Sequence, residues 1–363
     1  MNVEVSELVD QIILAALSLG ASDLHFNPCA DGLCIYARIH GKLIAFNQVT
    51  DFPFQIEQTA MARLKVLAKL SLAERRRPQD GQFHLFQGQV ACDLRMATMP
   101  TIRGERAVVR ILPQATPWQS MASLSLPPAL EDEVNRFFAG AGGMLVASGK
   151  VGSGKSTTLY ALLRERNQRG DSVLTIEDPV ERQLESFSQV EVDEKIGLTF
   201  AESLRNALRQ DPDMLMVGEI RDELTAQIAV RAGLTGHHLL STVHADTPEQ
   251  VITRLLEFGV ARSYLAQSLK LVIWQRLVPD LCTTCHGEGC ATCHGVGLIG
   301  RHAEFKMLCS SQILQLLNMP KQSYGHELPM VGEVRGALPI TNYEQRELGM
   351  IVAEQTESSI KAT

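Results

Sequence analysis

The sequence has no run of about 20 uninterrupted apolar residues, the length that a membrane-spanning helix needs. Its first 20 residues carry apolar side chains at helical spacing, but Glu4, Glu7 and Asp10 stand where a signal peptide would carry positive charge. We therefore expect a cytosolic protein, one that is still able to dock on a membrane complex.

The sequence also has no surplus of positive charge. It holds 34 Lys and Arg against 41 Asp and Glu, a formal net charge of −7. A protein whose main ligand is a nucleic acid needs extra Lys and Arg to neutralise phosphates. We therefore expect no direct nucleic-acid binding. The cluster Arg75-Arg76-Arg77 is either a local basic patch or a solvated helix end.

Cysteine is sparse and unevenly placed. Of eight cysteines, four lie between residues 282 and 293, and Cys29, Cys34, Cys92 and Cys309 are scattered. This distribution is typical of a reducing compartment and one metal site, rather than of a disulfide framework.

The length of 363 residues exceeds one ordinary core, so we expect two domains. The first, residues 1–112, mixes helical patterns with short alternating runs and predicts an α+β domain. Its expected helices are 5–19 and 57–70, and its expected strands are 33–39, 41–46, 82–86 and 90–96. Residues 113–128 are rich in Pro and Ser and predict a linker.

From residue 129 to 363 the pattern is that of a second, α/β domain. Four apolar runs alternate with helical segments, as in a parallel sheet that is buried on both faces. They are residues 144–147, 173–176, 214–217 and 238–242. The cysteine cluster at 282–293 belongs to this domain in our interpretation, and we expect a helical region after residue 300.

A phosphate-binding loop follows the first of these apolar runs. Its residues fit the pattern G-x-x-x-x-G-K-[ST] and are Gly149, Lys150, Val151, Gly152, Ser153, Gly154, Lys155 and Ser156. Glycines let backbone N–H groups face the β-phosphate, Lys155 supplies a cation, and Ser156 offers Mg²⁺ an oxygen. The pattern predicts ATP and Mg²⁺ as ligands. The alternative, a plain glycine-rich turn, is disfavoured by the flanking strand and helix.

Three other apolar runs lead to polar side chains at what should be the same sheet edge. Glu219 follows the run 214–217 and would orient the attacking water, with Gly218 replacing the usual Asp. Glu177 ends the run 173–176. His244 follows 238–242 and would sense the γ-phosphate. The alternatives are a salt-bridged surface acid for Glu219 and a structural histidine for His244.

These motifs together resemble the secretion NTPase family of type II secretion and type IV pilus ATPases. The resemblance rests on the phosphate loop with Thr157 to Tyr160, on residues 175–181, on 204–222 and on 235–244, and it extends upstream to Ala21-Ser22-Asp23-Leu24-His25. It implies a PAS-like N-terminal domain and a RecA-like ATPase domain. It also implies that Arg95 and Arg110 complete the catalytic site as arginine fingers, whereas without the resemblance we would interpret them as surface salt-bridge partners.

Two features depart from the family pattern. Lys150 and Val151 stand where Pro and Thr are usual, which should change the stiffness of the loop but not its phosphate contacts. We also expect, from the resemblance, that the chain lacks the additional N-terminal domain by which larger members dock. The recruitment surface is therefore not predicted.

Two C-x-x-C pairs, Cys282/Cys285 and Cys290/Cys293, predict a structural Zn²⁺ site. The alternatives are a redox pair or unligated thiols. His286 and His294 are possible substitute ligands, but we interpret them as exposed structural residues. Within the family, four such cysteines are typical of assembly ATPases rather than of the retraction type.

The resemblance implies a cyclic homo-hexamer that hydrolyses ATP to power assembly of a type IV pilus or a type II secretion pseudopilus. Its partner would be an inner-membrane platform protein, so that the cytoplasmic ring is peripheral to the membrane. The alternatives are a motor for pilus retraction or competence-type DNA uptake, and a nucleotide-dependent regulatory subunit with little turnover. A RecA-like DNA-remodelling enzyme is disfavoured by the acidic balance.

Overall fold

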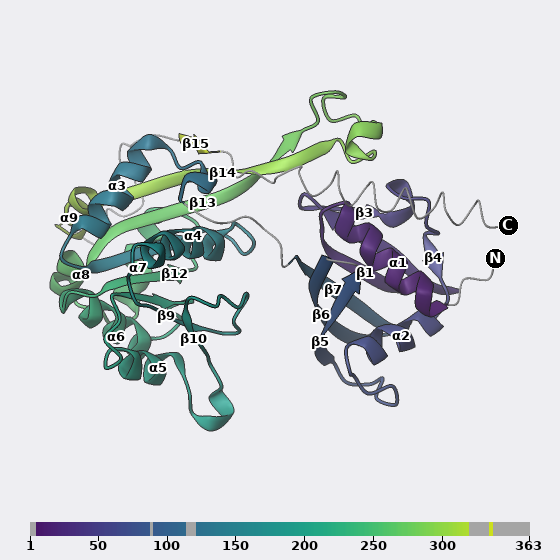
Figure 1. Cartoon of the computed structure of the whole chain (residues 1–363), viewed down its shortest axis with the longest axis horizontal. Helices are drawn as coiled ribbons and strands as arrows, with labels where there is room; N and C mark the ends of the chain where they lie inside the picture. The colour runs from purple at the N-terminus through teal and green to yellow at the C-terminus, as the bar shows by residue number, and fades with distance from the viewer. Residues whose placement is uncertain (1–4, 88–89, 114–120, 319–333, 337–363) are drawn as a thin grey trace. The chain divides into compact units, whose positions relative to one another are not determined.

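The computed structural model describes residues 5–87, 90–113, 121–318 and 334–336 (Figure 1). They divide into two compact units. The first holds the described residues up to 113 together with 279–301, and the second holds 121–278 and the described residues after 301. Most of the predicted linker, 114–120, lies outside the described residues.

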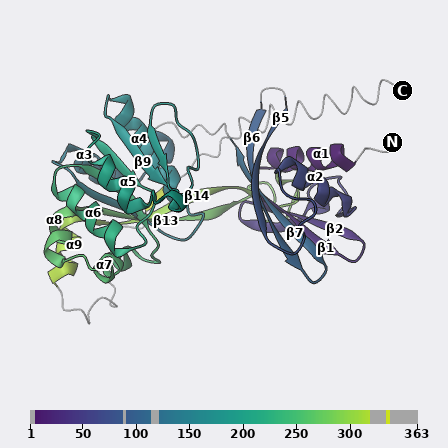
Figure 2. The same ribbon diagram turned by 90° about the horizontal axis from the view of Figure 1, so that it is seen from below.

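The first unit is built on an antiparallel sheet with the strand order β3-β2-β1-β7-β6-β5, in which β4 also pairs with β2. The strands are β1 (Ala21–Cys29), β2 (Gly32–Ile39), β3 (Lys42–Ala45), β4 (Gln55–Ile56), β5 (Gln79–Gln87), β6 (Val90–Thr101) and β7 (Gly104–Pro113). Helices α1 (Val5–Ser18) and α2 (Thr59–Leu67) pack on this sheet (Figures 1 and 2). Leu24 and Phe26 of β1 lie in the shared core.

The second unit is built on a sheet with the order β10-β9-β11-β12-β8-β13-β14-β15. Its strands are β8 (Gly143–Ser148), β9 (Val173–Glu177), β10 (Ser188–Glu191), β11 (Met214–Val217), β12 (His238–Val243), β13 (Leu269–Leu281), β14 (Leu298–Cys309) and β15 (Val334–Gly336). The pairs from β10 to β13 are parallel. The four apolar runs predicted as buried strands are β8, β9, β11 and β12.

Helices cover both faces of this second sheet. They are α3 (Pro128–Ala139), α4 (Lys155–Gln168), α5 (Phe200–Ala207), α6 (Glu223–Leu234), α7 (Pro248–Glu257), α8 (Arg262–Ser268) and α9 (Ser310–Asn318). Leu145 and Ala147 of β8 pack in one core with α3 and α4, whereas Met144 and Val146 pack in the other with α5 to α9. This alternation is the reason that the strand reads as a continuous apolar run.

The region after residue 300 differs from the sequence analysis. Residues 298–309 form strand β14, and a helix begins only at Ser310. The buried positions of β14 are Gly300, Ala303, Phe305 and Leu308, spaced by three, two and three residues. That spacing matches neither a helical nor a strand period. The segment forms a strand because it pairs beside β13 in the sheet.

Cys29 and Cys34 form a disulfide, although the sequence analysis expects scattered thiols there. The two residues flank the tight connection between β1 and β2, and the hairpin brings their Cα atoms to 6.1 Å.

Within the described residues, every helix is too short or too polar to cross a bilayer.

Candidate functional site

The predicted phosphate loop lies between β8 and α4. Gly149 has φ 134°, and a Cβ atom there would lie 2.2 Å from the backbone oxygen of Gln275. Gly154 is the left-handed residue, φ 89°, immediately before α4. Only glycine meets both requirements, since other residues avoid positive φ and carry the Cβ atom. Ser156 and Thr157 follow in the first turn of α4, both half-buried.

The side chain of Lys155 turns back over the loop. Its Nζ donates to the backbone oxygens of Gly149 at 2.9 Å and Lys150 at 3.0 Å. Burial lowers the pKa of Lys155, against the opposite effect of the carboxylates of Glu219 and Glu181.

The strands that carry the predicted site residues end at one edge of the sheet. Val217 of β11 lies opposite Ile176 of β9 on one side and Ser241 of β12 on the other. Val243 of β12 lies opposite Ser148, the last residue before the phosphate loop. The carboxyl ends of parallel strands are where ligands of open α/β sheets bind.

Glu219 and His244 lie in direct contact. The Nε2 atom of His244 is 3.3 Å from one carboxylate oxygen of Glu219, and Arg221 forms an ion pair with the other. Arg221 also lies 3.6 Å from a carboxylate oxygen of Asp178. The hydrogen bond with Glu219 raises the pKa of Arg221. The sequence analysis gives no role to Arg221, although it stands two residues after Glu219.

Glu177 is buried at the end of β9 and accepts three hydrogen bonds. The donors are the hydroxyl of Tyr160, the hydroxyl of Thr175 at 2.6 Å and the amide of Gln189 at 3.2 Å. Burial and the charge of Glu177 raise the pKa of Tyr160, so the phenol keeps its proton. These bonds tie the end of β9 to α4, the helix that follows the phosphate loop.

Gly218, which replaces the usual Asp, fits its place closely. A Cβ atom at this position would lie 3.3 Å from the backbone oxygen of Ile176 and 3.5 Å from the Cα atom of Glu177. A side chain at this position would require the backbone at the end of β9 to shift by a few tenths of an ångström. The close approach of the two strand ends therefore favours glycine at residue 218.

Arg95 and Arg110 belong to the first unit, where they lie opposite each other on β6 and β7. The Nε atom of Arg110 donates to Asp23 at 3.1 Å. Asp23 is almost fully buried and also accepts from Ser22 at 2.8 Å. The expected contact of the two arginines with a nucleotide stays a prediction.

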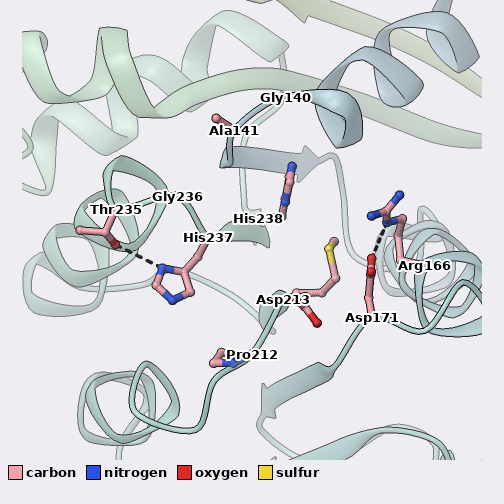
Figure 3. Close-up of a pocket in the computed structure, with 11 residues that line it drawn as sticks. Gly140, Ala141, Arg166, Asp171, Pro212, Asp213, Thr235, Gly236, His237 and His238 are labelled. Atoms are coloured by element: carbon pink, nitrogen blue, oxygen red, sulfur yellow. Dashed lines mark hydrogen bonds and ion pairs between the residues drawn. The ribbon is translucent and has the colours of Figure 1, made fainter.

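A cavity of about 500 Å³ lies beside the phosphate loop. It is lined by Gly149, Lys150, His244 and polar residues of α7 with the turn before it, among them Asp246, Gln250 and Arg254. A second cavity, of about 400 Å³, lies where β11 and β12 begin (Figure 3).

His237 and His238 line that second cavity, with Thr235 contacting His237 at 3.2 Å and Arg166 paired with Asp171 (Figure 3). Burial lowers the pKa of His238. His237, part of the motif at 235–244, therefore lies at the opposite end of β12 from His244.

Gln275 of β13 is a site residue that the sequence analysis does not identify. Its side chain is fully buried, and its Nε2 atom donates to the backbone oxygen of Ser153 at 2.7 Å. The sequence signal is weak, because Gln275 stands next to Arg276 between the apolar residues 271–274 and 277–278. Only the pairing of β13 beside β8 shows that this amide reaches the phosphate loop.

The four predicted cysteine ligands lie together, and within the described residues no other group of three or more metal-binding side chains is found. All four sulfur atoms lie within 4.8 Å of one another. Cys282 and Cys290, Cys285 and Cys293, and Cys290 and Cys293 are separated by 3.7 to 3.8 Å. A tetrahedron with Zn–S bonds of about 2.3 Å has edges of about 3.8 Å, so the sulfur positions fit zinc.

Backbone N–H groups point at these sulfur atoms. Gly297 and Cys290 each donate to Cys293 at 3.2 Å. Burial raises the pKa of Cys293, but the hydrogen bonds from Cys290 and Gly297 outweigh it and bring the pKa to about 6. His286 and His294 are exposed, as expected.

Comparison with known proteins identifies the family. The model of the type II/IV secretion system protein family matches residues 2–337. The chain belongs to this family.

Two similar relatives in the secretion family are the putative type II secretion system protein E of Escherichia coli and the type II secretion system ATPase E of Vibrio cholerae. They are 42% and 41% identical to the chain over 281 residues, 77% of its length. The match covers 56% and 55% of these relatives, so the chain spans little more than half of their length. Among solved structures, the Legionella pneumophila ATPase DotB has the same fold, with a TM-score of 0.69 and 23% identity over 87% of this chain and 85% of that one.

Proposed function

We propose that this member of the secretion family hydrolyses ATP and converts the energy into movement of its two units. The observation that carries the proposal is the contact between Glu219 and His244 at the sheet edge that also holds the phosphate loop. A carboxylate in this place orients the attacking water, and an imidazole beside it senses the γ-phosphate. The family match and the relative named as an ATPase support the same reading.

The residues of the loop fit ATP and Mg²⁺. Residues 149–154 lead directly into the start of α4, where free backbone N–H groups and the helix dipole favour negative charge. Lys155 is held by two backbone oxygens that a phosphate oxygen can replace, so its ammonium would turn to the β- and γ-phosphates. Ser156 would offer its hydroxyl to Mg²⁺, and Glu177 would support the metal and water network through its contacts with α4.

Arg221 gives Glu219 a second contact. In the structure Glu219 contacts both Arg221 and His244. The γ-phosphate of ATP would compete with Glu219 for these two side chains. We propose that release of Glu219 accompanies nucleotide binding. The carboxylate is then free to accept a proton from water.

We infer that the N-terminal unit, residues 1–112, is PAS-like and that the second unit is a RecA-like ATPase domain that begins at residue 129 after a linker. Residues 279–301 interrupt the second domain along the chain and belong to the first unit. Arg95 and Arg110 of the first unit would reach the nucleotide as arginine fingers when the units close. The guanidinium groups neutralise charge that develops in the transition state. Hydrolysis is thereby coupled to closure.

The cysteine element would hold Zn²⁺ through Cys282, Cys285, Cys290 and Cys293. Four thiolates in a closed tetrahedron are typical of a structural zinc site. The metal would fix the fold of residues 279–301.

The cellular role that we propose is assembly of a type II secretion pseudopilus or a type IV pilus. The two relatives at 42% and 41% identity are both named as type II secretion proteins. The working form would be a cyclic homo-hexamer in the cytoplasm, recruited to the inner membrane by a platform protein. A retraction or DNA-uptake motor is the second candidate, and the four cysteines favour the assembly type.

Steady-state ATP hydrolysis by the purified protein and by Glu219→Gln tests the activity. We expect the variant to lose at least about 100-fold in kcat, because its amide cannot polarise water, while it still binds MgATP. Lys155→Ala should instead lose nucleotide binding. Equal rates for the wild type and Glu219→Gln would contradict the motor and leave a binding or regulatory subunit.

A further inference from the structure

A buried amide lies beneath the phosphate loop. Gln275 lies on β13 and is fully buried, two residues after Ile273 of one apolar core and three after Val272 of the other. A polar group that is taken out of water costs free energy unless it is hydrogen-bonded. Glutamine at this place therefore needs a specific partner, and the partner is the loop.

Gln275 contacts the loop at both of its ends. Its side chain donates to the backbone oxygen of Ser153, near the end of the loop, at 2.7 Å. Its backbone oxygen lies 2.2 Å from the position of a Cβ atom on Gly149, the first loop residue. One residue of β13 therefore fixes where the loop begins and where it turns into α4.

The orientation of the amide is determined by its surroundings. If the nitrogen and oxygen were exchanged, two oxygens would face each other at hydrogen-bond distance, so Nε2 must point at Ser153. Oε1 is then left buried with no partner among the described residues. The hydroxyls of Ser148 and Ser153 are also buried without a hydrogen-bond partner.

We propose that Gln275 is a positioning residue that holds the phosphate loop in its binding conformation. A hydrogen bond to the oxygen of Ser153 turns the peptide between Ser153 and Gly154 so that its N–H faces the other way, into the cradle. This inference rests on the proposed function, because it concerns the same phosphate site. Gln275 touches the loop and not the nucleotide.

The proposal predicts an unusual pairing of effects. Gln275→Leu removes the bond to Ser153, but it also removes an unpartnered buried oxygen from an apolar strand. Leucine leaves the backbone oxygen of Ser153 without its donor, which destabilises the loop, and the loss of the unpartnered Oε1 offsets part of this effect. The thermal midpoint of the full-length protein should therefore fall by no more than about 5 °C. The affinity for MgATP and for MgADP should both fall about ten-fold, since the loss of one hydrogen bond alters the cradle of the β-phosphate.

Titration with fluorescent MgATP and MgADP analogues, together with thermal unfolding, measures both effects. Gln267→Leu is the matched control: Gln267 also donates its amide to a backbone oxygen, that of Ser263 at 3.0 Å, but on the exposed face of α8. It should change neither quantity. Gln275→Glu should bind nucleotide more weakly than Gln275→Leu, because its carboxylate faces the oxygen of Ser153.

Unchanged nucleotide affinity in Gln275→Leu would overturn the proposal. Failure of both Gln275→Leu and Gln275→Met to fold would also overturn it, since the amide would then serve the stability of the sheet. A wild-type protein that binds no nucleotide would have a different meaning. It would contradict the proposed function itself.

Discussion

Tyr160 and Glu177 form a hydrogen bond in the interior of the second unit. Tyr160→Phe removes that donor and leaves a buried carboxylate oxygen with one partner fewer. We expect the free energy of unfolding to fall by about 1–3 kcal/mol, the cost of an unsatisfied buried charged group. Urea unfolding followed by circular dichroism measures the change.

Tyr264→Phe is the matched control, since Tyr264 is 52% exposed. It should alter the free energy of unfolding by less than about 0.5 kcal/mol. The same loss in both variants would show that the bond to Glu177 contributes nothing specific.

His25 makes the stability of the first unit sensitive to pH. Burial lowers the pKa of His25, Arg106 lowers it further, Asp23 acts in the opposite direction and Arg38 again lowers it. The unfolded histidine binds a proton near pH 6.5 while the folded one stays neutral. Stability is therefore complete above about pH 6.5 and is lost as the pH falls from there toward the lowered pKa.

We expect the wild type to lose more of its free energy of unfolding between about pH 7.5 and about pH 5.5 than His25→Gln. The glutamine can still accept from Arg106, which donates to Nδ1 of His25 at 2.9 Å. Denaturant unfolding at both pH values measures the difference. Parallel pH profiles would exclude His25 as a source of acid sensitivity.

At this scale the sequence predicts a residue well when its neighbours in the chain define its role. The phosphate loop is contiguous, so Gly149, Lys155 and Ser156 are recognisable at once. Gln275 acts on a loop that the fold brings to it, and Arg221 contacts Asp178 at the end of another strand as well as the nearby Glu219. A buried polar residue in an apolar run is a signal, but it does not name its partner.

Among the elements, residues 279–301 have the most unexpected place. They belong to the first unit, where Val296 lies in the core with Phe46 and Ile44, and Gly295 lies close to the backbone of Gln48. Position along the chain alone predicts that this element belongs to the second domain. Zinc would hold the two C-x-x-C turns together and keep Val296 in place.

Removal of zinc should therefore loosen the first unit as well as the element. Metal analysis should find one equivalent of zinc per chain in the wild type. The Cys285→Ser variant should lose this zinc. Hydrogen exchange should become faster in 279–301 and around Phe46. Cys309→Ser, a half-buried cysteine outside the cluster, is the control.

An exchange increase confined to 282–293 would contradict the structural role of the element in the first unit. Full zinc content in Cys285→Ser would contradict the ligand set itself.

The elements that the sequence predicts correctly are those with one clear period. Strands β8, β9, β11 and β12 are buried on both faces, and α1 carries an apolar stripe. Strand β14 is missed because its charged residues, among them Glu304 in an ion pair with Arg276 of β13, hide its buried positions. A strand that forms because it pairs with a neighbour cannot be predicted from its own sequence pattern.

The whole chain passes from one unit to the other more than once. It leaves the first unit after residue 116, returns at 279 and leaves again after 301. Strand β13 therefore contacts both functional elements. It contacts the phosphate loop through Gln275, and it ends at Leu281, next to Cys282 of the cysteine element. A closure movement of the units must be accommodated at these crossings, because they carry the covalent connection.

In a ring of coupled subunits, one inactive subunit should reduce ATP hydrolysis by the others, which independent subunits would not show. If the protein works as a cyclic hexamer, one Glu219→Gln subunit that holds ATP without hydrolysing it should stall its neighbours. With one-sixth variant subunits, only about a third of randomly mixed six-membered rings contain none. ATP hydrolysis at constant total protein should therefore fall to about a third of the wild-type rate, well below the proportional value.

The measurement mixes the two proteins under conditions that dissociate the ring, reassembles them and follows hydrolysis against the fraction of variant. Gln267→Leu, an exposed substitution on α8, serves as the mixing control and should leave the rate unchanged. A straight-line decline with Glu219→Gln would mean that each subunit hydrolyses ATP alone. The steep decline requires that the site around Glu219 in one chain depends on the state of the next, which is the property that a motor needs in order to convert hydrolysis into ordered movement.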